Sequence, residues 1–126
     1  MKYLLDTNLI IDAIRKFQPT IDFMEHLLHF PNSQAYLSSI TNLELHLGRS
    51  AKDPNALQEI NLLINQFKAI DVNLKISGSA GELVRELSID TLDAVIAATA
   101  INYDLILVTK NRKHFTKIKD LKLISP

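Results

Sequence analysis

The feature of this sequence that most restricts its fold is a run of four apolar residues, Leu105 to Val108. The run does not alternate with polar residues, so a strand formed by it must be buried on both faces. Shorter apolar runs at Tyr3 to Leu5, Ala35 to Ser38 and Ala69 to Val72 are typical of further strands, and we expect an edge strand at Leu121 to Ile124. Strands that alternate with helices predict an α/β fold of three layers, a mostly parallel central sheet flanked by helices.

Length and composition limit the class of protein. The chain has 126 residues, with 47% apolar and 22% charged residues, which is typical of one globular domain with its own core. We therefore expect a single domain over residues 1–126. The sequence has no cysteine, which excludes disulfides, thiolate metal sites and cysteine nucleophiles. It has no secretory signal pattern and no apolar stretch long enough for a membrane span, so we expect a cytoplasmic protein without membrane contact.

Apolar residues at helical spacing predict the helices between these strands. The predicted segments are residues 9–16, 21–28, 41–48, 57–67, 80–87 and 90–101. Asp53, Pro54 and Asn55 mark a turn before the fourth segment. The stripe on this segment, Leu57, Ile60, Leu63 and Ile64, suits either a dimer interface or plain core.

Three carboxylates stand at the starts of predicted elements. Asp6 follows the first strand, Glu44 follows the second, and Asp93 lies near the start of the last helix. In a wound parallel sheet the carboxyl ends of the strands share one edge, where ligands bind. Each acid also has a capping explanation. Asp6 or Asn8 suits an N-cap, and Thr41 with Glu44 fits a capping box.

The last helix offers the same choice. Asp90 is favoured as its N-cap, with Asp93 in the first turn near the positive end of the helix dipole. The alternative is that Asp90 assists Asp93 as an auxiliary acid.

Taken together, the carboxylates predict a cation site. Clustered carboxylates repel one another unless a cation compensates them, and Mg²⁺ prefers oxygen ligands. Such a site suits metal-assisted hydrolysis of a phosphodiester. After the most buried strand, Thr109 and Asn111 are expected to bond a metal-bound water or to position one of the acids. The alternative for Asn111 is an Asx-type turn that leads to Phe115 as a core anchor.

Basic residues gather near the C-terminus although the formal net charge is zero. The cluster consists of Lys110, Arg112, Lys113, Lys117, Lys119 and Lys122, opposed there only by Asp120. It can neutralise nucleic-acid phosphates, or it is simply a solvated face. We predict Lys110, Arg112 and Lys113 as the contacts of nucleic-acid phosphates.

Four segments resemble the PIN-domain family, in particular the small VapC-like toxins of type II toxin–antitoxin modules. They are Leu5–Asn8, Ser39–Leu45, Leu92–Ala100, and Leu107–Asn111 with Phe115. Each segment is weak alone, but together they cover nearly the whole chain in the order of the family. The resemblance implies a PIN-like fold and an endoribonuclease that depends on Mg²⁺ or Mn²⁺. It also implies a homodimer neutralised by a cognate antitoxin.

By position, the resemblance makes Asp6, Glu44 and Asp93 the metal-binding acids. Asn111 occupies the fourth catalytic position, where many relatives have Asp and others Asn. Thr109 matches the hydroxyl residue ahead of it.

The resemblance also assigns Thr7 or Asn8 to support the first acid, and Asn8 then becomes the preferred cap or supporting residue. His114 departs from the pattern, because relatives often carry an acid there. The sequence leaves two alternatives open: a PIN nuclease that processes RNA without being a toxin, and a PIN-fold binding module with weak or no catalysis.

Overall fold

The computed structural model describes residues 1–126, apart from the side chains of Arg49 and Ser50. Its strands are β1 (Lys2–Leu5), β2 (Gln34–Ser38), β3 (Lys68–Ile70), β4 (Ile106–Val108) and β5 (Leu123–Ile124). Its α-helices are α1 (Thr7–Ile14), α2 (Gln18–Leu28), α3 (Ser39–Leu47), α4 (Pro54–Ile64), α5 (Leu74–Leu87) and α6 (Thr91–Asn102). Two short 3₁₀ helices are η1 (Arg49–Lys52) and η2 (Arg112–His114).

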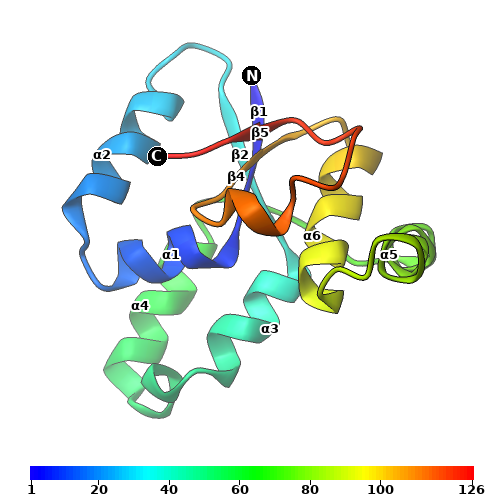
Figure 1. Ribbon diagram of the computed structural model, residues 1–126. Helices are drawn as coiled ribbons and strands as arrows, with labels where there is room; N and C mark the ends of the chain where they lie inside the picture. The colour runs from blue at the N-terminus through cyan, green and yellow to red at the C-terminus, as the bar shows by residue number, and fades with distance from the viewer.

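The five strands form one parallel sheet in the order β3-β2-β1-β4-β5. Helices α5 and α6 cover one face, and α1, α2 and α4 lie on the other side (Figure 1). The predicted three-layer α/β fold is therefore confirmed. The strands β1 and β2 begin one residue before their predicted runs, and β3, β4 and β5 are shorter than theirs. The chain order reverses between the neighbours β1 and β4, which is where wound sheets place their ligand crevice.

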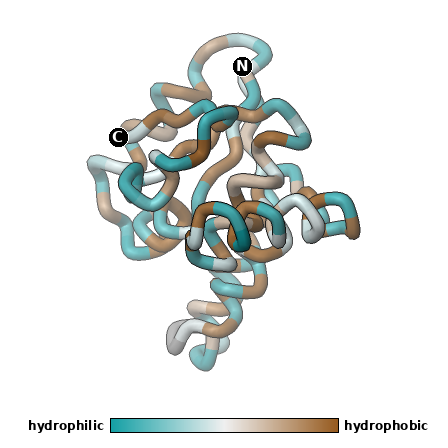
Figure 2. Tube along the Cα trace, turned by 45° about the vertical axis from the view of Figure 1, so that its right-hand side comes forward, coloured by the Kyte–Doolittle hydropathy of each residue, from teal (hydrophilic) through white to brown (hydrophobic). Residues whose placement is uncertain are grey.

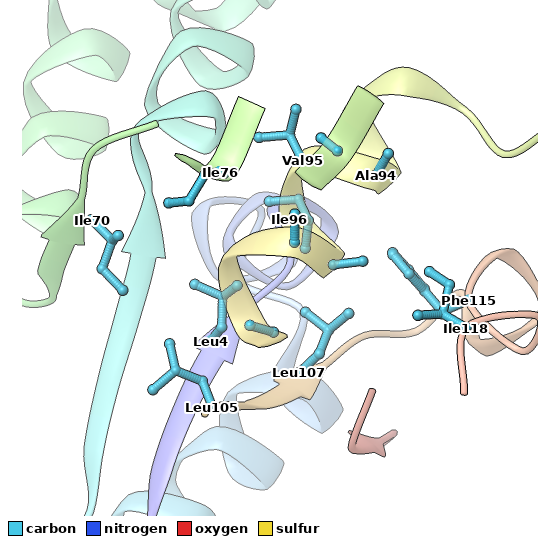
Figure 3. Packing of buried hydrophobic residues seen from close by; sticks show 14 residues of the cluster. Leu4, Ile70, Ile76, Ala94, Val95, Ile96, Leu105, Leu107, Phe115 and Ile118 are labelled. Atoms are coloured by element: carbon cyan, nitrogen blue, oxygen red, sulfur yellow. The ribbon is translucent and has the colours of Figure 1, made fainter. Parts of the chain in front are cut away.

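Side chains of the central strands alternate between two cores. Leu4 and Leu107 point to the core under α5 and α6, together with Phe115 and Ile118 (Figure 3). Tyr3 and Leu5 of β1 and Val108 of β4 point to the core under α1, α2 and α4. This period of two is the geometry of a strand buried on both faces.

Helix α6 is apolar all around, and every residue from Ala94 to Ala100 is buried. A helix without a polar face has to be enclosed, and α6 is packed between the sheet and α5. By contrast, apolar and polar residues alternate along the other helices (Figure 2). On α4, Ile60 is buried and Leu63 and Ile64 pack against the core under α1, so this stripe contributes to the core.

Helix α3 begins at Ser39, two residues before the predicted start. Ser38 is its N-cap, because the Ser38 hydroxyl accepts a hydrogen bond from the Ile40 N–H at 3.1 Å. The capping box of Thr41 and Glu44 is therefore wrong, since both residues lie inside the helix. The hydroxyl at the last position of β2 satisfies the free N–H before Thr41 is reached.

Within the described part of the chain, no helix is long and apolar enough to cross a membrane.

Candidate active site

Two polar residues follow the central strands β1 and β4 in register. Leu5 pairs with Val108, and the Asp6 N–H continues the ladder by donating to the Val108 carbonyl at 3.0 Å. Asp6 and Thr109 are therefore side by side at the carboxyl edge. The Thr109 hydroxyl donates to Asp6 Oδ2 at 2.7 Å, and both residues are buried.

Asp6 is held at both carboxylate oxygens. Its Oδ1 accepts from the Thr7 N–H at 2.8 Å, so Asp6 is also the N-cap of α1. Burial raises the pKa of Asp6, and this outweighs the lowering by the Thr109 and Thr7 hydrogen bonds and by His114. The capping interpretation of Asp6 is therefore confirmed, and Asp6 also lines the cleft at the sheet edge. Asn8 is not the cap, because it lies within α1.

Thr109 is itself fixed by its neighbours. Its hydroxyl accepts from the Asn111 N–H at 3.0 Å, and its carbonyl accepts from the Ser125 hydroxyl at 2.7 Å. The hydroxyl also donates to Asp6, and these three hydrogen bonds together leave the Thr109 side chain little freedom to turn. Of the two expectations for Thr109, the structure shows the contact with an acid.

Glu44 reaches the cleft from the second turn of α3. Its Oε1 accepts from the Thr7 hydroxyl at 2.7 Å, and the Thr7 hydroxyl also bonds the Thr41 hydroxyl at 2.9 Å. The side chain of Thr7 therefore supports the second acid, and only its backbone supports Asp6. Thr7 thus supports the first acid as expected, but through its backbone N–H, because the start of α1 turns its hydroxyl toward α3.

The Glu44 carboxyl is half-buried, and its pKa is raised. Burial is the largest cause, and the hydrogen bond from Thr7 opposes it. The charges of Asp6, Asp93 and Asp90 raise it further. These repulsions show that carboxylates from β1, α3 and α6 meet at one place.

Asp93 completes the group from the first turn of α6. Burial raises its pKa, His114 lowers it, and Asp6 and Asp90 raise it again. Asp90 is the N-cap, as predicted, because its Oδ2 accepts from the N–H groups of Leu92 at 3.0 Å and of Asp93 at 3.3 Å.

His114 is the site residue whose role was missed in the sequence. Its Nδ1 lies 3.1 Å from Asp93 Oδ2, so an imidazole stands beside one of the three acids. The sequence shows His114 only as a departure from the family pattern. In the structure, the neighbouring Phe115 is 0% exposed and anchors the 3₁₀ turn that carries His114 over the sheet edge.

These side chains line one cleft of about 380 Å³. Its lining includes the three acids together with Thr7, Asn8 and Asn111, and Asp90 and His114 stand at its rim. The cleft thus brings together the predicted acids and their predicted neighbours, although Thr109 reaches it only through Asp6.

The donor set suits a hard cation. Oxygen atoms from three repelling carboxylates face the cleft, and the buried Asn8 Oδ1 has no hydrogen-bond partner in the described structure. In the described residues, no three His, Asp or Glu side chains are placed so that they alone could hold a metal ion. Mg²⁺ usually takes one or two carboxylates and keeps several waters, and it is rarely enclosed by protein ligands alone. An open cleft of carboxylates and bound water therefore fits Mg²⁺ or Mn²⁺.

The predicted RNA-binding residues do not share one environment. Lys110 Nζ lies 2.6 Å from Asp12 Oδ2 and 5.1 Å from the centre of the Phe17 ring. Lys110 therefore does not line the acidic cleft. Arg112 is exposed on η2. Lys113 lines a groove beside the acidic cleft.

The fold and the cleft define a doubly wound α/β protein with an acidic site at the carboxyl edge of its sheet. The chain belongs to the PIN domain family, whose match spans residues 3–121. It is 33% identical to the protein named Ribonuclease VapC2 of Rickettsia felis, over 98% of this chain and 96% of that protein.

Solved structures agree with this assignment. The fold is similar to that of VapBC2 from Rickettsia felis bound to a DNA fragment from their promoter, with a TM-score of 0.84 and 30% identity over 99% of this chain and 98% of that one. It is also similar to a chain of a toxin–antitoxin complex from Klebsiella pneumoniae, with a TM-score of 0.80 and 29% identity over 97% and 95% of the two chains.

Proposed function

We propose that this protein is an endoribonuclease dependent on Mg²⁺ or Mn²⁺, acting in the cytoplasm as the toxin of a toxin–antitoxin pair. The observation that carries the proposal is the meeting of Asp6, Glu44 and Asp93 in one cleft at the switch point of the sheet. The similarity to a protein named a ribonuclease supports RNA as the substrate.

In this proposal, Asp6, Glu44 and Asp93 hold one or two of these cations, and water completes the ligand shell. When bound, the ion supplies an activated water and stabilises the charge that develops on the phosphodiester. The chain's own residues orient the acids. Thr109 fixes Asp6 Oδ2, and Thr7 fixes Glu44 Oε1.

Two side-chain oxygens in the cleft lining remain without a hydrogen-bond partner from Thr7 or Thr109. Glu44 Oε2 is free of the Thr7 bond, and the Asn8 Oδ1 needs a partner. Asn111 lines the same cleft, where its amide can donate to a phosphate oxygen or hold a water.

Cleavage of RNA by single-residue variants tests the assignment of the acids. Asp6→Asn and Asp93→Asn should each reduce Mg²⁺- or Mn²⁺-dependent cleavage by at least a hundredfold, and EDTA should stop the unmodified protein. The matched control is Asp71→Asn, since Asp71 also follows a strand at this edge but is exposed and lies outside the cleft.

Circular dichroism and thermal melting should show that all three variants are folded. Undiminished cleavage by either cleft variant would overturn the assignment. A folded, unmodified protein that binds RNA and cuts none of it would favour a binding module.

The toxin role and the homodimer need separate tests. We expect a short gene for an antitoxin beside the gene for this chain, and expression of the chain alone should arrest growth while co-expression restores it. Cleavage without arrest would favour an RNA-processing nuclease. Light scattering after size exclusion should give the mass of two chains, and the mass of one chain would exclude a stable homodimer.

A further inference from the structure

A second groove adjoins the acidic cleft. It has a volume of about 260 Å³. Its lining residues are Ser88, Ile89, Asp90, Asp93, Lys113, His114 and Lys117. Asp90, Asp93 and His114 also line the acidic cleft, so the two hollows share a wall.

Both carboxylates of the shared wall have polar partners. The Asp90 carboxylate accepts from two N–H groups at the start of α6, and Asp93 faces His114. The His114 side chain is 55% exposed and stands between the two hollows. An RNA strand that passes the acids beside His114 can therefore continue into the groove.

The groove presents two lysine ammonium groups to an RNA strand. Lys113 and Lys117 are exposed, and in the described structure neither lies within 4.0 Å of a carboxylate oxygen. Lys110, by contrast, pairs with Asp12, and Lys122 pairs with Asp104. Unpaired lysines beside a cleft are the usual contacts of a phosphate backbone.

We propose that this groove holds the RNA backbone next to the bond that is cut, with Lys113 and Lys117 contacting phosphates of neighbouring nucleotides. The inference rests on the proposed ribonuclease function and adds the direction in which the strand leaves the acids. It also replaces Lys110 by Lys117 in the expected RNA contacts, because the pairing with Asp12 holds Lys110 elsewhere.

The salt dependence of RNA binding tests this groove directly. A fluorescent single-stranded RNA of mixed sequence is titrated with the full chain in EDTA at several salt concentrations, and gels verify that the RNA remains intact. The slope of log K against log salt is negative, and its magnitude should fall by about 0.7 in Lys113→Gln and in Lys117→Gln, and by about 1.4 in the double variant. Lys119→Gln, which removes the same charge from the same segment but lies outside the groove, should leave the slope unchanged.

Unchanged slopes in both groove variants would overturn the inference, as would an equal loss in Lys119→Gln or the absence of salt-dependent binding by the unmodified chain. Cleavage assays separate this result from the proposed function. If the unmodified chain cuts RNA but the slopes do not change, the groove is wrong and the function stands. If the slopes fall as expected but no RNA is cut, the groove stands and the function fails.

Discussion

The hydrogen bond from Thr109 to Asp6 should make a measurable and pH-dependent contribution to stability. Thr109→Val keeps the shape of a fully buried side chain but removes the hydroxyl that lies 2.7 Å from Asp6 Oδ2. Hydrogen bonds to charged groups contribute about 1.5–3 kcal/mol. For a domain of this size, that loss lowers Tm by roughly 5–10 °C.

The pH dependence follows from the charge on Asp6. Burial raises its pKa, and the Thr109 bond opposes that rise, so the substitution raises the pKa further while the unfolded state is unchanged. The destabilisation should therefore be full at pH values above the pKa of folded Asp6, where its carboxylate is ionised. It should shrink as the pH falls through the pKa of folded Asp6, because a bond between neutral groups contributes only about 0.5–1.5 kcal/mol.

Thermal and urea unfolding at neutral and mildly acidic pH measure this effect, with Thr99→Val as the matched control. Thr99 is equally buried, but its hydroxyl donates to the neutral Val95 carbonyl at 2.7 Å. Its loss should be smaller and independent of pH. Equal, pH-independent losses in the two variants would refute the argument that Thr109 acts on an ionised Asp6.

Three further substitutions follow from the charges at the sheet edge. Glu44→Gln should raise Tm at neutral pH, because burial and the neighbouring acids raise the pKa of Glu44. Its ionisation therefore costs the folded state stability as the pH rises from the unfolded to the folded pKa, and the gain should vanish in acid. His114→Gln should raise the pKa of Asp93 in a carbon-13 NMR titration, since His114 lowers that pKa; an unchanged or lower value would contradict the 3.1 Å contact. Lys110→Gln should cost no more than about 1 kcal/mol in urea unfolding, as expected for an ion pair at the protein surface that water can reach. Burial acts to raise the pKa of Asp12, but hydrogen bonds from Lys110 and Thr20 lower it overall. This cost should therefore be present above the unfolded pKa and should fall in acid, and a cost that grows in acid would contradict it.

The fold and the acids could be predicted because their signals are local. The uninterrupted run at Leu105–Val108 predicts a buried parallel strand, and Asp6 and Asp93 stand beside recognisable strand ends and helix starts. Asp90 was predicted as a cap from its position alone, since a cap depends on the next three residues.

The partners of these residues could not be predicted, because they depend on which strands are neighbours. Thr109 meets Asp6 across 103 positions and Lys110 meets Asp12 across 98 positions, and only the placement of β4 beside β1 joins them. The direction of the Thr7 hydroxyl toward Glu44 likewise requires α1 and α3 to start on adjacent strands. His114 was visible only as a departure from the family pattern, and its contact with Asp93 depends on the turn of η2.

The most direct test of the central claim is a Mn²⁺ titration of the folded protein followed by amide NMR. If Asp6, Glu44 and Asp93 form one cation site, sub-stoichiometric Mn²⁺ should broaden the amides around Asp6, Glu44, Asp93 and Asn111 first. Asp6→Asn should weaken that broadening at least tenfold, while Asp71→Asn should leave it unchanged. Broadening spread over exposed carboxylates such as Asp22 and Asp120, or equal broadening in Asp6→Asn, would contradict the account.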